Sequence, residues 1–397
     1  MSNVIYIGGV PPEDLQEKVR EWGSPTDFAG YTFQKACLKG LDYYFPDIKV
    51  LSTIFVVPYP LSRKYYLPTI HYSHKGESAP QYDVMMGMLN IVGLNFISKY
   101  LRLRKNLKAM LSSSDENVVV TYSLFSPHLL AILSQRKKIT KVCVIIPDLP
   151  EYMTSKKNVF YKMAKRIDRV LINYAIKRFD CFVLLSKYMK ECLPIDDKPW
   201  TLYEGVYNHI DIGPVKKTKY KTILYTGNAG MRTGIINLIE AFEKIHSTDY
   251  RLWIRGNGDA EGYIREMTKI DKRISLIEPL SKKALLELQK QATVLVNPTS
   301  PAQEFTKYFF PSKTMEYLAS GTPTLMYKLP CIPDEYDPYI YYIQDDSVDG
   351  IYNSLIDICE KPYGELEEFG QKASLFIKEN KNPIKQAGKI VELLSNC

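Results

Sequence analysis

The chain has 397 residues, a net charge of +8 and an apolar fraction of 45%. This length suffices for two domains with full hydrophobic cores, and the composition is that of a soluble globular protein. The positive charge favours an anionic partner, but it does not choose among nucleic acid, phospholipid and a phosphorylated substrate.

The sequence predicts neither a targeting segment nor a spanning helix. Its start lacks the basic and long apolar regions of a signal peptide, and no apolar run reaches the roughly 18 residues that cross a bilayer. Any membrane contact is therefore expected to be peripheral. Seven cysteines are scattered without a CxxC pair, which favours buried thiols in a reducing cytoplasm over a zinc site.

The first half alternates short apolar runs with helical patterns. Strands are predicted at residues 4–7, 50–57, 118–122, 142–146 and 181–185, and helices at 32–44 and 129–135. Because strands that alternate with helices form parallel sheets, this half is expected to be a Rossmann-like domain. Gly8 and Gly9 follow its first strand and Asp148 follows its fourth, which places them at the edge where ligands bind.

Aromatic and basic side chains are concentrated in three other stretches of this half. Residues 58–83 are dense in Tyr, Pro, His and Lys and include Tyr65 and His71. Long irregular segments of this kind tend to be functional or mobile. Residues 85–108 combine apolar side chains with basic ones such as Arg102.

The third stretch, residues 156–178, predicts an amphipathic helix. Its apolar residues recur at helical spacing, whereas Lys162, Lys165 and Arg166 fall largely elsewhere on the wheel. Such a helix can lie on an anionic membrane surface. The alternative is a helix that faces the core and has a solvated basic back.

The second half repeats the alternation of strands and helices. Strands are predicted at residues 222–225, 251–254, 274–277, 294–296 and 324–326, and helices at 235–245, 260–269, 282–291 and 312–319. The strands of the two halves together are too many for one sheet, so we infer a second Rossmann-like domain. The pattern pauses within residues 205–219, which divides the chain into residues 1–205 and 206–373, followed by a helical stretch at 374–397.

Glycine-rich turns follow two strands of the second half. They supply the candidate residues Gly227, Asn228, Arg232, Gly256 and Asn257. Such a turn lets the backbone approach a phosphate, and an arginine fork can bind two phosphate oxygens. Glycine turns are common, so these alone do not establish a nucleotide site.

Residues 309–323, Phe-Phe-Pro-Ser-Lys-Thr-Met-Glu-Tyr-Leu-Ala-Ser-Gly-Thr-Pro, predict a helix with Pro311 in its first turn and Ser312 as its cap. The amides and partial positive charge of a helix N-terminus suit a diphosphate, and Lys313 adds a cation there. Glu316 lies about one turn further on, where its carboxylate can accept hydrogen bonds from ribose. The alternative is an ordinary capped amphipathic helix.

Residues 311–323 resemble the donor-binding helix of retaining glycosyltransferases of family 4, especially bacterial enzymes of capsule and exopolysaccharide synthesis. The resemblance implies the α/β GT-B fold, in which two Rossmann-like domains with parallel sheets face an interdomain cleft. It implies that residues 1–205 bind the acceptor, that residues 206–373 bind the nucleotide sugar, and that the helix at 374–397 crosses back to the first domain.

The resemblance also assigns roles to residues. In the family pattern Glu-x7-Glu, Glu316 matches the second glutamate, which holds the ribose, and Tyr308 stands in place of the first. Arg232 lies one residue before the place of the family's phosphate-binding lysine. His128 is either structural or part of the cleft.

The expected sites fall into three groups. The catalytic group is Asp148, Arg232 and Lys313. The nucleotide-sugar group is Gly8, Gly9, Glu204, Gly227, Asn228, Gly256, Asn257, Glu278, Pro279, Tyr308, Pro311, Ser312 and Glu316. The acceptor or membrane group is Tyr65, His71, Arg102, Lys162, Lys165 and Arg166.

The implied function is transfer of a sugar from a nucleoside-diphosphate sugar, expected to be UDP-linked, to a polyprenyl-diphosphate-linked oligosaccharide in bacterial surface polysaccharide synthesis. The expected location is the inner face of the cytoplasmic membrane. We expect no metal, no other cofactor and no nucleic acid, since the chain lacks the Asp-x-Asp motif of GT-A enzymes. Two alternatives stay open: a nucleotide-sugar epimerase of GT-B architecture, and a catalytically silent partner subunit.

Overall fold

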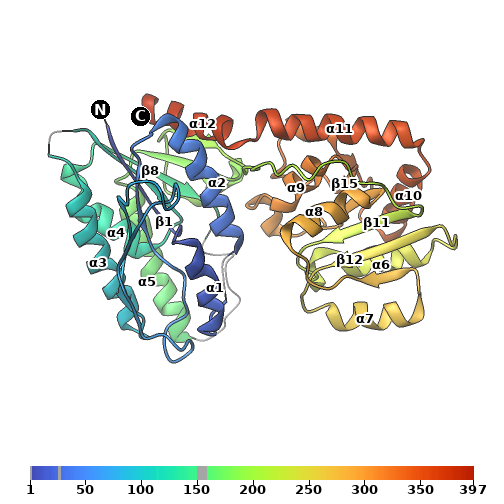
Figure 1. The fold of residues 1–397 in the computed structure, drawn as a ribbon, viewed down its shortest axis with the longest axis horizontal. Helices are drawn as coiled ribbons and strands as arrows, with labels where there is room; N and C mark the ends of the chain where they lie inside the picture. Colours follow the sequence, from blue (N-terminus) through green and yellow to red (C-terminus); the bar gives the residue numbers. More distant parts are fainter. Residues whose placement is uncertain (1, 26–27, 114, 150–158) are drawn as a thin grey trace. The chain divides into compact units, whose positions relative to one another are not determined.

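The computed structural model describes residues 2–25, 28–113, 115–149 and 159–397, and the chain divides into two compact units. The N-terminal unit comprises Met1–Val206 and Pro383–Cys397, and the C-terminal unit comprises Tyr207–Asn382. Each unit has its own sheet and its own hydrophobic core (Figure 1). Both are therefore α/β units that can position ligand groups at their own sheet edges.

The N-terminal unit is built on an eight-stranded sheet of order β10-β9-β8-β7-β1-β2-β5-β4. Its strands are β1 (Asn3–Gly8), β2 (Lys49–Ser52), β4 (Ile70–Tyr72), β5 (Asp83–Met85), β7 (Asn117–Tyr122), β8 (Lys141–Ile146), β9 (Cys181–Leu184) and β10 (Trp200–Leu202). All neighbours are parallel except the edge strand β4, which is antiparallel to β5. A separate antiparallel pair joins β3 (Tyr66–Leu67) to β6 (Met88–Leu89).

Helices cover both faces of this sheet. On one face, α2 (Phe28–Tyr44) and α12 (Pro383–Asn396) share a core with alternate strand residues such as Tyr6 and Val120. On the other side Figure 1 shows α3 (Leu94–Met110), α4 (Ser126–Ser134) and α5 (Val159–Ile176), with α3 packed on α4 and α4 packed on α5. The short helix α1 (Glu13–Glu21) buries Leu15 and Val19 in a smaller cluster.

The sequence predictions for this half differ from the structure at several ends. The strand predicted at 50–57 stops at Ser52, after which only the Thr53 amide continues the bonding to β1, through Gly8 O at 2.8 Å. The helix predicted at 32–44 begins four residues earlier. The helices α1 and α3 and the edge strands were not predicted, because their apolar periodicity is interrupted by basic and aromatic side chains.

The C-terminal unit has a six-stranded, fully parallel sheet of order β13-β12-β11-β14-β15-β16. Its strands are β11 (Lys221–Thr226), β12 (Tyr250–Arg255), β13 (Ile274–Leu276), β14 (Val294–Asn297), β15 (Thr324–Met326) and β16 (Tyr341–Tyr342). Its helices are α6 (Ile235–Glu243), α7 (Glu261–Ile270), α8 (Lys282–Gln291), α9 (Ser312–Ser320), α10 (Val348–Cys359) and α11 (Tyr363–Asn380).

Strand β11 shows how this sheet separates two cores. Ile223 and Tyr225 point into the large core shared with α6, α10 and α11. Leu224 points the other way, into a small cluster with Tyr317 of α9 and Leu288 of α8. Successive side chains of a strand point to opposite faces of the sheet, and Leu224 therefore packs α9 against the sheet beside the end of β11.

The end of the chain corrects one prediction. The helical stretch predicted at 374–397 is two helices, since α11 begins at Tyr363 and stays in the C-terminal unit, whereas α12 starts at Pro383 and belongs to the N-terminal unit. Pro383 lacks the amide hydrogen that would continue α11. Lys381 is buried at the break, where its ammonium pairs with Glu335 at 2.6 Å.

Candidate functional site

Two glycine turns interlock at the carboxyl edge of the C-terminal sheet. The Gly227 amide donates to Arg255 O at 2.9 Å, and the Ala229 amide donates to Asn257 O at 3.0 Å. Gly227 has φ +130°, which side chains other than hydrogen rarely permit. A Cβ on Gly256 would lie 1.9 Å from Gly227 O, so this close approach requires glycine as well.

Lys313, in the first turn of α9, faces this pair of turns. Its Nζ would lie 3.1 Å from a Cβ on Gly227, and it donates to Tyr225 Oη at 3.2 Å. Among the described residues no carboxylate is within ion-pair distance of it. Burial lowers the Lys313 pKa to about 8. An ammonium group without a counter-ion beside open glycine turns suits an anionic ligand.

The N-terminus of α9 differs in detail from the prediction. Pro311 occupies the N-cap position and Ser312 is the first helical residue, exposed, so Ser312 does not cap the helix. No side chain caps this end within the described part of the chain. Because a proline supplies no side-chain acceptor, the amides of Ser312 and Lys313 are left for a ligand, whereas the Thr314 amide already donates to Pro311 O at 2.9 Å. Gly321 ends the helix with φ +77°.

Glu316 lies one turn into α9. Its Oε1 accepts a hydrogen bond from Gln289 Nε2 of α8. Burial and then the Glu316 charge raise the pKa of Tyr207 to about 12, which places that phenol near the carboxylate. The sequence did not single out Gln289, because nothing in a helical glutamine signals contact with a distant carboxylate. Tyr308 follows a 3₁₀ turn at Glu304–Lys307 and is half-buried.

A cavity of about 200 Å³ is lined both by the turn after β12 and by the segment around Glu278, two stretches that the sequence analysis predicted separately. Its lining is Arg255, Gly256, Asn257, Glu261, Arg265, Leu276, Ile277, Glu278 and Pro279. Arg255 Nε is buried there, and it has no hydrogen-bond partner in the described structure. A buried donor of this kind is costly unless a ligand or water satisfies it. Arg232 and Asn228 are exposed on the turn after β11.

The N-terminal unit gathers polar groups at the carboxyl edge of its own sheet. Thr53 Oγ1 lies 3.2 Å from His128 Nε2 and 3.3 Å from Gly8 O. The His128 pKa is lowered to about 3 by burial and by the Lys99 charge, and burial lowers the Lys99 pKa to about 8. The Gly9 amide already donates to Gln34 Oε1 at 2.7 Å. His128 is thus a neutral, buried imidazole.

Asp148 and Glu204 lie in different surroundings. Asp148 is exposed on the bend after β8, at the same sheet edge. Glu204 is buried within the N-terminal unit, and its Oε2 lies 3.4 Å from Lys389 Nζ of α12. The neighbouring Gly205 carbonyl accepts from Gln386 of α12. This segment therefore anchors the returning helix to its unit.

The Tyr- and His-rich segment 58–83 is partly exposed, and His74 ties it to the rest of the N-terminal unit. Tyr65 and His71 are exposed, with His71 on the edge strand β4. His74 bridges Asp42 and Asp83 at 2.9 and 2.6 Å. Burial lowers the His74 pKa, but hydrogen bonds to both carboxylates outweigh it and raise the value to about 9.

Helix α5 exposes its apolar side chains. Met163, Ile167, Val170 and Tyr174 are 51–63% exposed and recur on one stripe. The alternative of a core-facing stripe is therefore wrong for these four side chains; the side chain of Phe160 lies outside the described residues. Lys162 and Arg166 are exposed beside the stripe, and Lys165 is half-buried. Arg102 is exposed on α3.

Within the described ranges the structure offers neither a cluster of metal ligands nor a membrane-spanning helix. No group of three or more His, Cys, Asp or Glu side chains there could hold a metal ion. No helix in that part of the chain is long and apolar enough to cross a membrane.

Comparisons with known proteins place the fold. Residues 220–361 match the model of "Glycosyl transferases group 1". No curated protein matches the chain. Similar solved structures include sucrose-phosphate synthase from Thermosynechococcus elongatus, with a TM-score of 0.64 and 13% identity over 99% of this chain and 98% of that one.

Two other similar structures carry bound molecules. An α,α-trehalose-phosphate synthase (UDP-forming) from Burkholderia xenovorans, in complex with glucose-6-phosphate, has a TM-score of 0.62 and 11% identity over 98% and 99% of the two chains. A point mutant of TarM from S. aureus, in complex with fondaparinux, α-GlcNAc-glycerol and UDP, has a TM-score of 0.58 and 9% identity over 98% and 99%.

These findings define the class of the protein. Two Rossmann-like units with parallel sheets, similar over nearly their whole length to GT-B structures, give the chain the GT-B fold. Residues 220–361, which lie in the C-terminal unit, form a glycosyltransferase group 1 domain. The protein is a glycosyltransferase of the GT-B type.

Proposed function

We propose that this enzyme transfers a sugar, with retention of configuration, from a UDP-linked donor to a polyprenyl-diphosphate-linked oligosaccharide in bacterial surface polysaccharide synthesis. The observation that carries the donor half is Lys313, a half-buried ammonium without a carboxylate partner among the described residues, facing the Gly227 turn. A similar structure adds support, since the TarM mutant was solved in complex with UDP.

In this proposal the C-terminal unit holds the donor. The Lys313 ammonium and the first-turn amides of α9 neutralise the diphosphate, and the Arg232 fork reaches its outer oxygens. Glu316 accepts hydrogen bonds from the ribose hydroxyls, held in place by Gln289. The base enters the 200 Å³ cavity, where Arg255 Nε and the backbone beside Glu278 and Pro279 meet its polar edge.

The chemistry follows from that arrangement. As the bond from the anomeric carbon to the diphosphate breaks, negative charge grows on the leaving phosphate, where cations and amides stabilise it most. The acceptor hydroxyl attacks from the same face, and its proton passes to the leaving phosphate. No protein nucleophile takes part, and we propose that no metal or other cofactor is needed.

The acceptor half of the proposal rests on the N-terminal unit. The exposed apolar stripe of α5 beside Lys162 and Arg166 suits the surface of an anionic membrane, where a lipid-linked acceptor resides. Tyr65 and His71 are exposed and offer stacking and hydrogen-bonding groups to a glycan. We therefore propose a peripheral location on the cytoplasmic face of the membrane.

Nucleotide release with and without lipid tests this function. The protein is mixed with a panel of nucleotide sugars, and UDP is measured before and after adding a bacterial membrane lipid extract. We expect lipid-dependent UDP release for at least one UDP-sugar. An epimerase would interconvert sugars without releasing nucleotide, and a silent subunit would do neither; either outcome contradicts the proposal.

A pair of variants checks the assignment of the phosphate contact in the same assay. With a soluble acceptor, Arg232→Ala should slow transfer by about tenfold or more, because a charged hydrogen bond to the leaving group is lost. Lys162→Ala, on α5, is the matched loss of charge away from the donor site and should change the rate little. Equal effects would contradict the assigned role of Arg232.

A further inference from the structure

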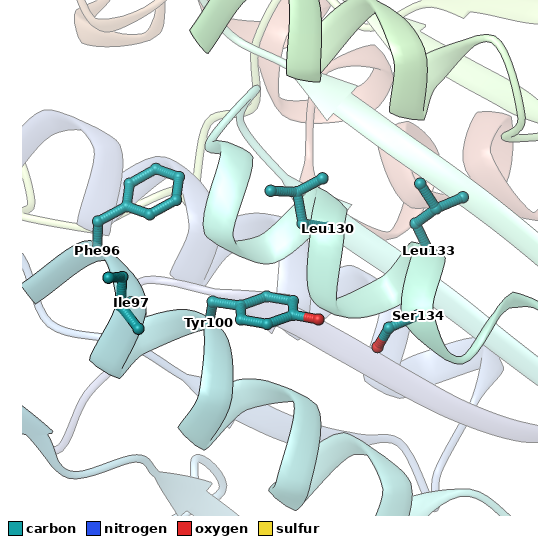
Figure 2. A pocket seen from close by; sticks show the side chains of 6 residues that line it. All are labelled: Phe96, Ile97, Tyr100, Leu130, Leu133 and Ser134. Carbon is teal, nitrogen blue, oxygen red and sulfur yellow. The ribbon is translucent and has the colours of Figure 1, made fainter. Parts of the chain in front are cut away.

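An open apolar pocket of about 330 Å³ lies between α3 and α4 of the N-terminal unit. Its lining is Phe96, Ile97, Tyr100, Leu130, Leu133 and Ser134. Figure 2 shows the first three projecting from α3 and the last three from α4, on facing walls. Five of the six lining side chains are aromatic or aliphatic, and none is charged. Water in such a pocket finds few partners, so an apolar group is the better occupant.

The surface around the pocket is apolar as well. Leu94, Ile97 and Leu101 recur along one stripe of α3 and are 50–53% exposed. Helix α4 packs against both α3 and α5, so the exposed α5 stripe of Met163, Ile167, Val170 and Tyr174 belongs to the same side of the unit. Exposed apolar area of this extent on neighbouring elements marks an interaction surface rather than scattered surface residues.

The exposed charged side chains described on α3 and α5 are all basic, and the one acidic residue of α5 described, Asp168, is half-buried. The described part of α3 contains no acidic residue, and its exposed basic side chains are Arg102, Arg104, Lys105 and Lys108. On α5, Lys162, Arg166 and Arg169 are exposed. The exposed stripe of α3 is thus apolar in its first half and basic in its second. An occupant that is apolar at one end and anionic at the other matches this order.

We propose that the pocket between α3 and α4 holds a segment of the hydrocarbon chain of an anionic lipid, whose phosphate lies against the basic end of α3. This inference rests on the proposed function for the identity of that lipid as the acceptor. A chain held in the pocket is withdrawn from the bilayer, which presents the attached phosphate and glycan at a defined place on the N-terminal unit. Recognition then includes the lipid itself, in addition to the sugar.

Binding of a water-soluble isoprenoid phosphate tests the pocket. The probe is farnesyl phosphate, titrated calorimetrically into the full-length protein, with inorganic phosphate as the head group alone and farnesol as the chain alone. We expect farnesyl phosphate to bind more tightly than either fragment. The variant Ser134→Trp fills the pocket from α4 and should weaken farnesyl phosphate by about tenfold or more, because the apolar contacts of several chain carbons are lost.

The matched control is Ser395→Trp, the same substitution at an exposed position of α12, outside the pocket lining and away from the basic end of α3, which should bind the probe as the native protein does. If Ser134→Trp proves unfolded by circular dichroism, Ile97→Gln at the exposed mouth replaces it with the same expectation. Unchanged affinity in the pocket variant, equal losses in the control, or no binding by the native protein would each overturn the proposal. So would light scattering that shows a native dimer converted to a monomer by Ser134→Trp, since a second copy would then cover the pocket.

The same samples separate this inference from the proposed function. UDP release from the donor in the presence of a soluble acceptor, without farnesyl phosphate binding, would support the transferase and refute the lipid pocket. Binding of farnesyl phosphate that Ser134→Trp abolishes, without UDP release under any condition, would support the pocket and refute the transfer reaction.

Discussion

Single side chains decide the chemistry of the donor site. Lys313 and Tyr225 come from different elements, and their contact at 3.2 Å places a cation over an aromatic ring beside the Gly227 turn. The low pKa of Lys313 arises from burial without a nearby carboxylate, whereas a lysine with a carboxylate partner would titrate higher. The site therefore carries a positive charge that a ligand can neutralise.

This environment makes donor affinity depend on pH. With a pKa of about 8, Lys313 is protonated below that pH and neutral above it. Of the two forms of Lys313, only the protonated one attracts a diphosphate. UDP affinity should therefore be highest below about pH 8 and fall by up to about tenfold per pH unit above it. Bound UDP raises the lysine pKa, so the complex loses its proton at higher pH. Calorimetric titration above about pH 7, where the nucleotide phosphate is fully ionised, measures this directly.

The variant Lys313→Arg is the control for this titration. Arginine stays protonated throughout the range, so the variant should bind UDP with a nearly flat pH dependence. A flat profile in the native protein as well would show that Lys313 does not face the diphosphate.

At the scale of elements, the interlocked turns after β11 and β12 give the donor site its shape. Both turns depend on hydrogen-bonded backbone and on glycine at the crossing. Two side chains add to this, since Tyr225 Oη donates to Asn228 O and the Met231 amide donates to Asp259 Oδ1 at 2.7 Å. The pairing positions the start of α6 and the walls of the 200 Å³ cavity at once. A disturbance in one turn should therefore reach both parts of the site.

Substitution of Gly256 tests this coupling. In Gly256→Ala the new Cβ would lie 1.9 Å from Gly227 O, so the backbone must shift. We expect a loss of about 1–3 kcal/mol in the free energy of unfolding and weaker UDP binding. Chemical denaturation and calorimetry measure the two effects.

Gly262→Ala provides the comparison. A Cβ there meets no atom within 4 Å, and alanine in α7 should be neutral or stabilising by up to about 1 kcal/mol. If both variants behave alike, the close approach of the two turns does not limit the site.

At the scale of the whole molecule, two independent cores share one chain whose last helix returns to the first unit. Ala387, Ile390 and Leu394 of α12 lie in the N-terminal core, and a Cβ on Gly40 of α2 would lie 2.0 Å from Pro383 O. The residues to which the proposed function assigns UDP contacts, Lys313, Glu316 and Arg255 among them, lie in the other unit, although Gly8, Gly9 and Glu204 of the predicted nucleotide-sugar group lie in the first. Stability of the first unit and donor binding by the second should thus be separable.

The variant Ile390→Ala tests this separation. Loss of a fully buried side chain should destabilise the N-terminal unit by about 2–5 kcal/mol, while UDP affinity stays unchanged. Hydrogen exchange should accelerate in β1, β7 and α2 and remain native in β11 and β12. The exposed neighbour Glu392→Ala should stay within about 0.5 kcal/mol of native stability. Equal acceleration in both units would contradict the division.

Much of the fold was predictable because its central strands are buried on both faces. Such strands are continuous apolar runs, as at 118–122 and 142–146, so their positions can be predicted from the sequence without the tertiary structure. The four helices predicted between residues 235 and 319 fall within two residues of their observed ends for a related reason, since α6, α7, α8 and α9 present one apolar face each. Edge strands β4 and β16 were missed, because short, half-exposed strands lack that pattern.

The sequence alone determined the two Rossmann-like units, the glycine turns and the helix at residues 312–320, since each depends on local periodicity or on glycine and proline chemistry. The GT-B architecture was implied by the resemblance of residues 311–323 to a known family. Tertiary structure decided what the side chains do. It alone showed that Gln289 holds Glu316, that Lys313 has no carboxylate beside it in the described structure, and that Glu204 pairs with α12. It also decided that the α5 stripe faces solvent, because the wheel of an amphipathic helix is the same whether its apolar side meets a core or a membrane.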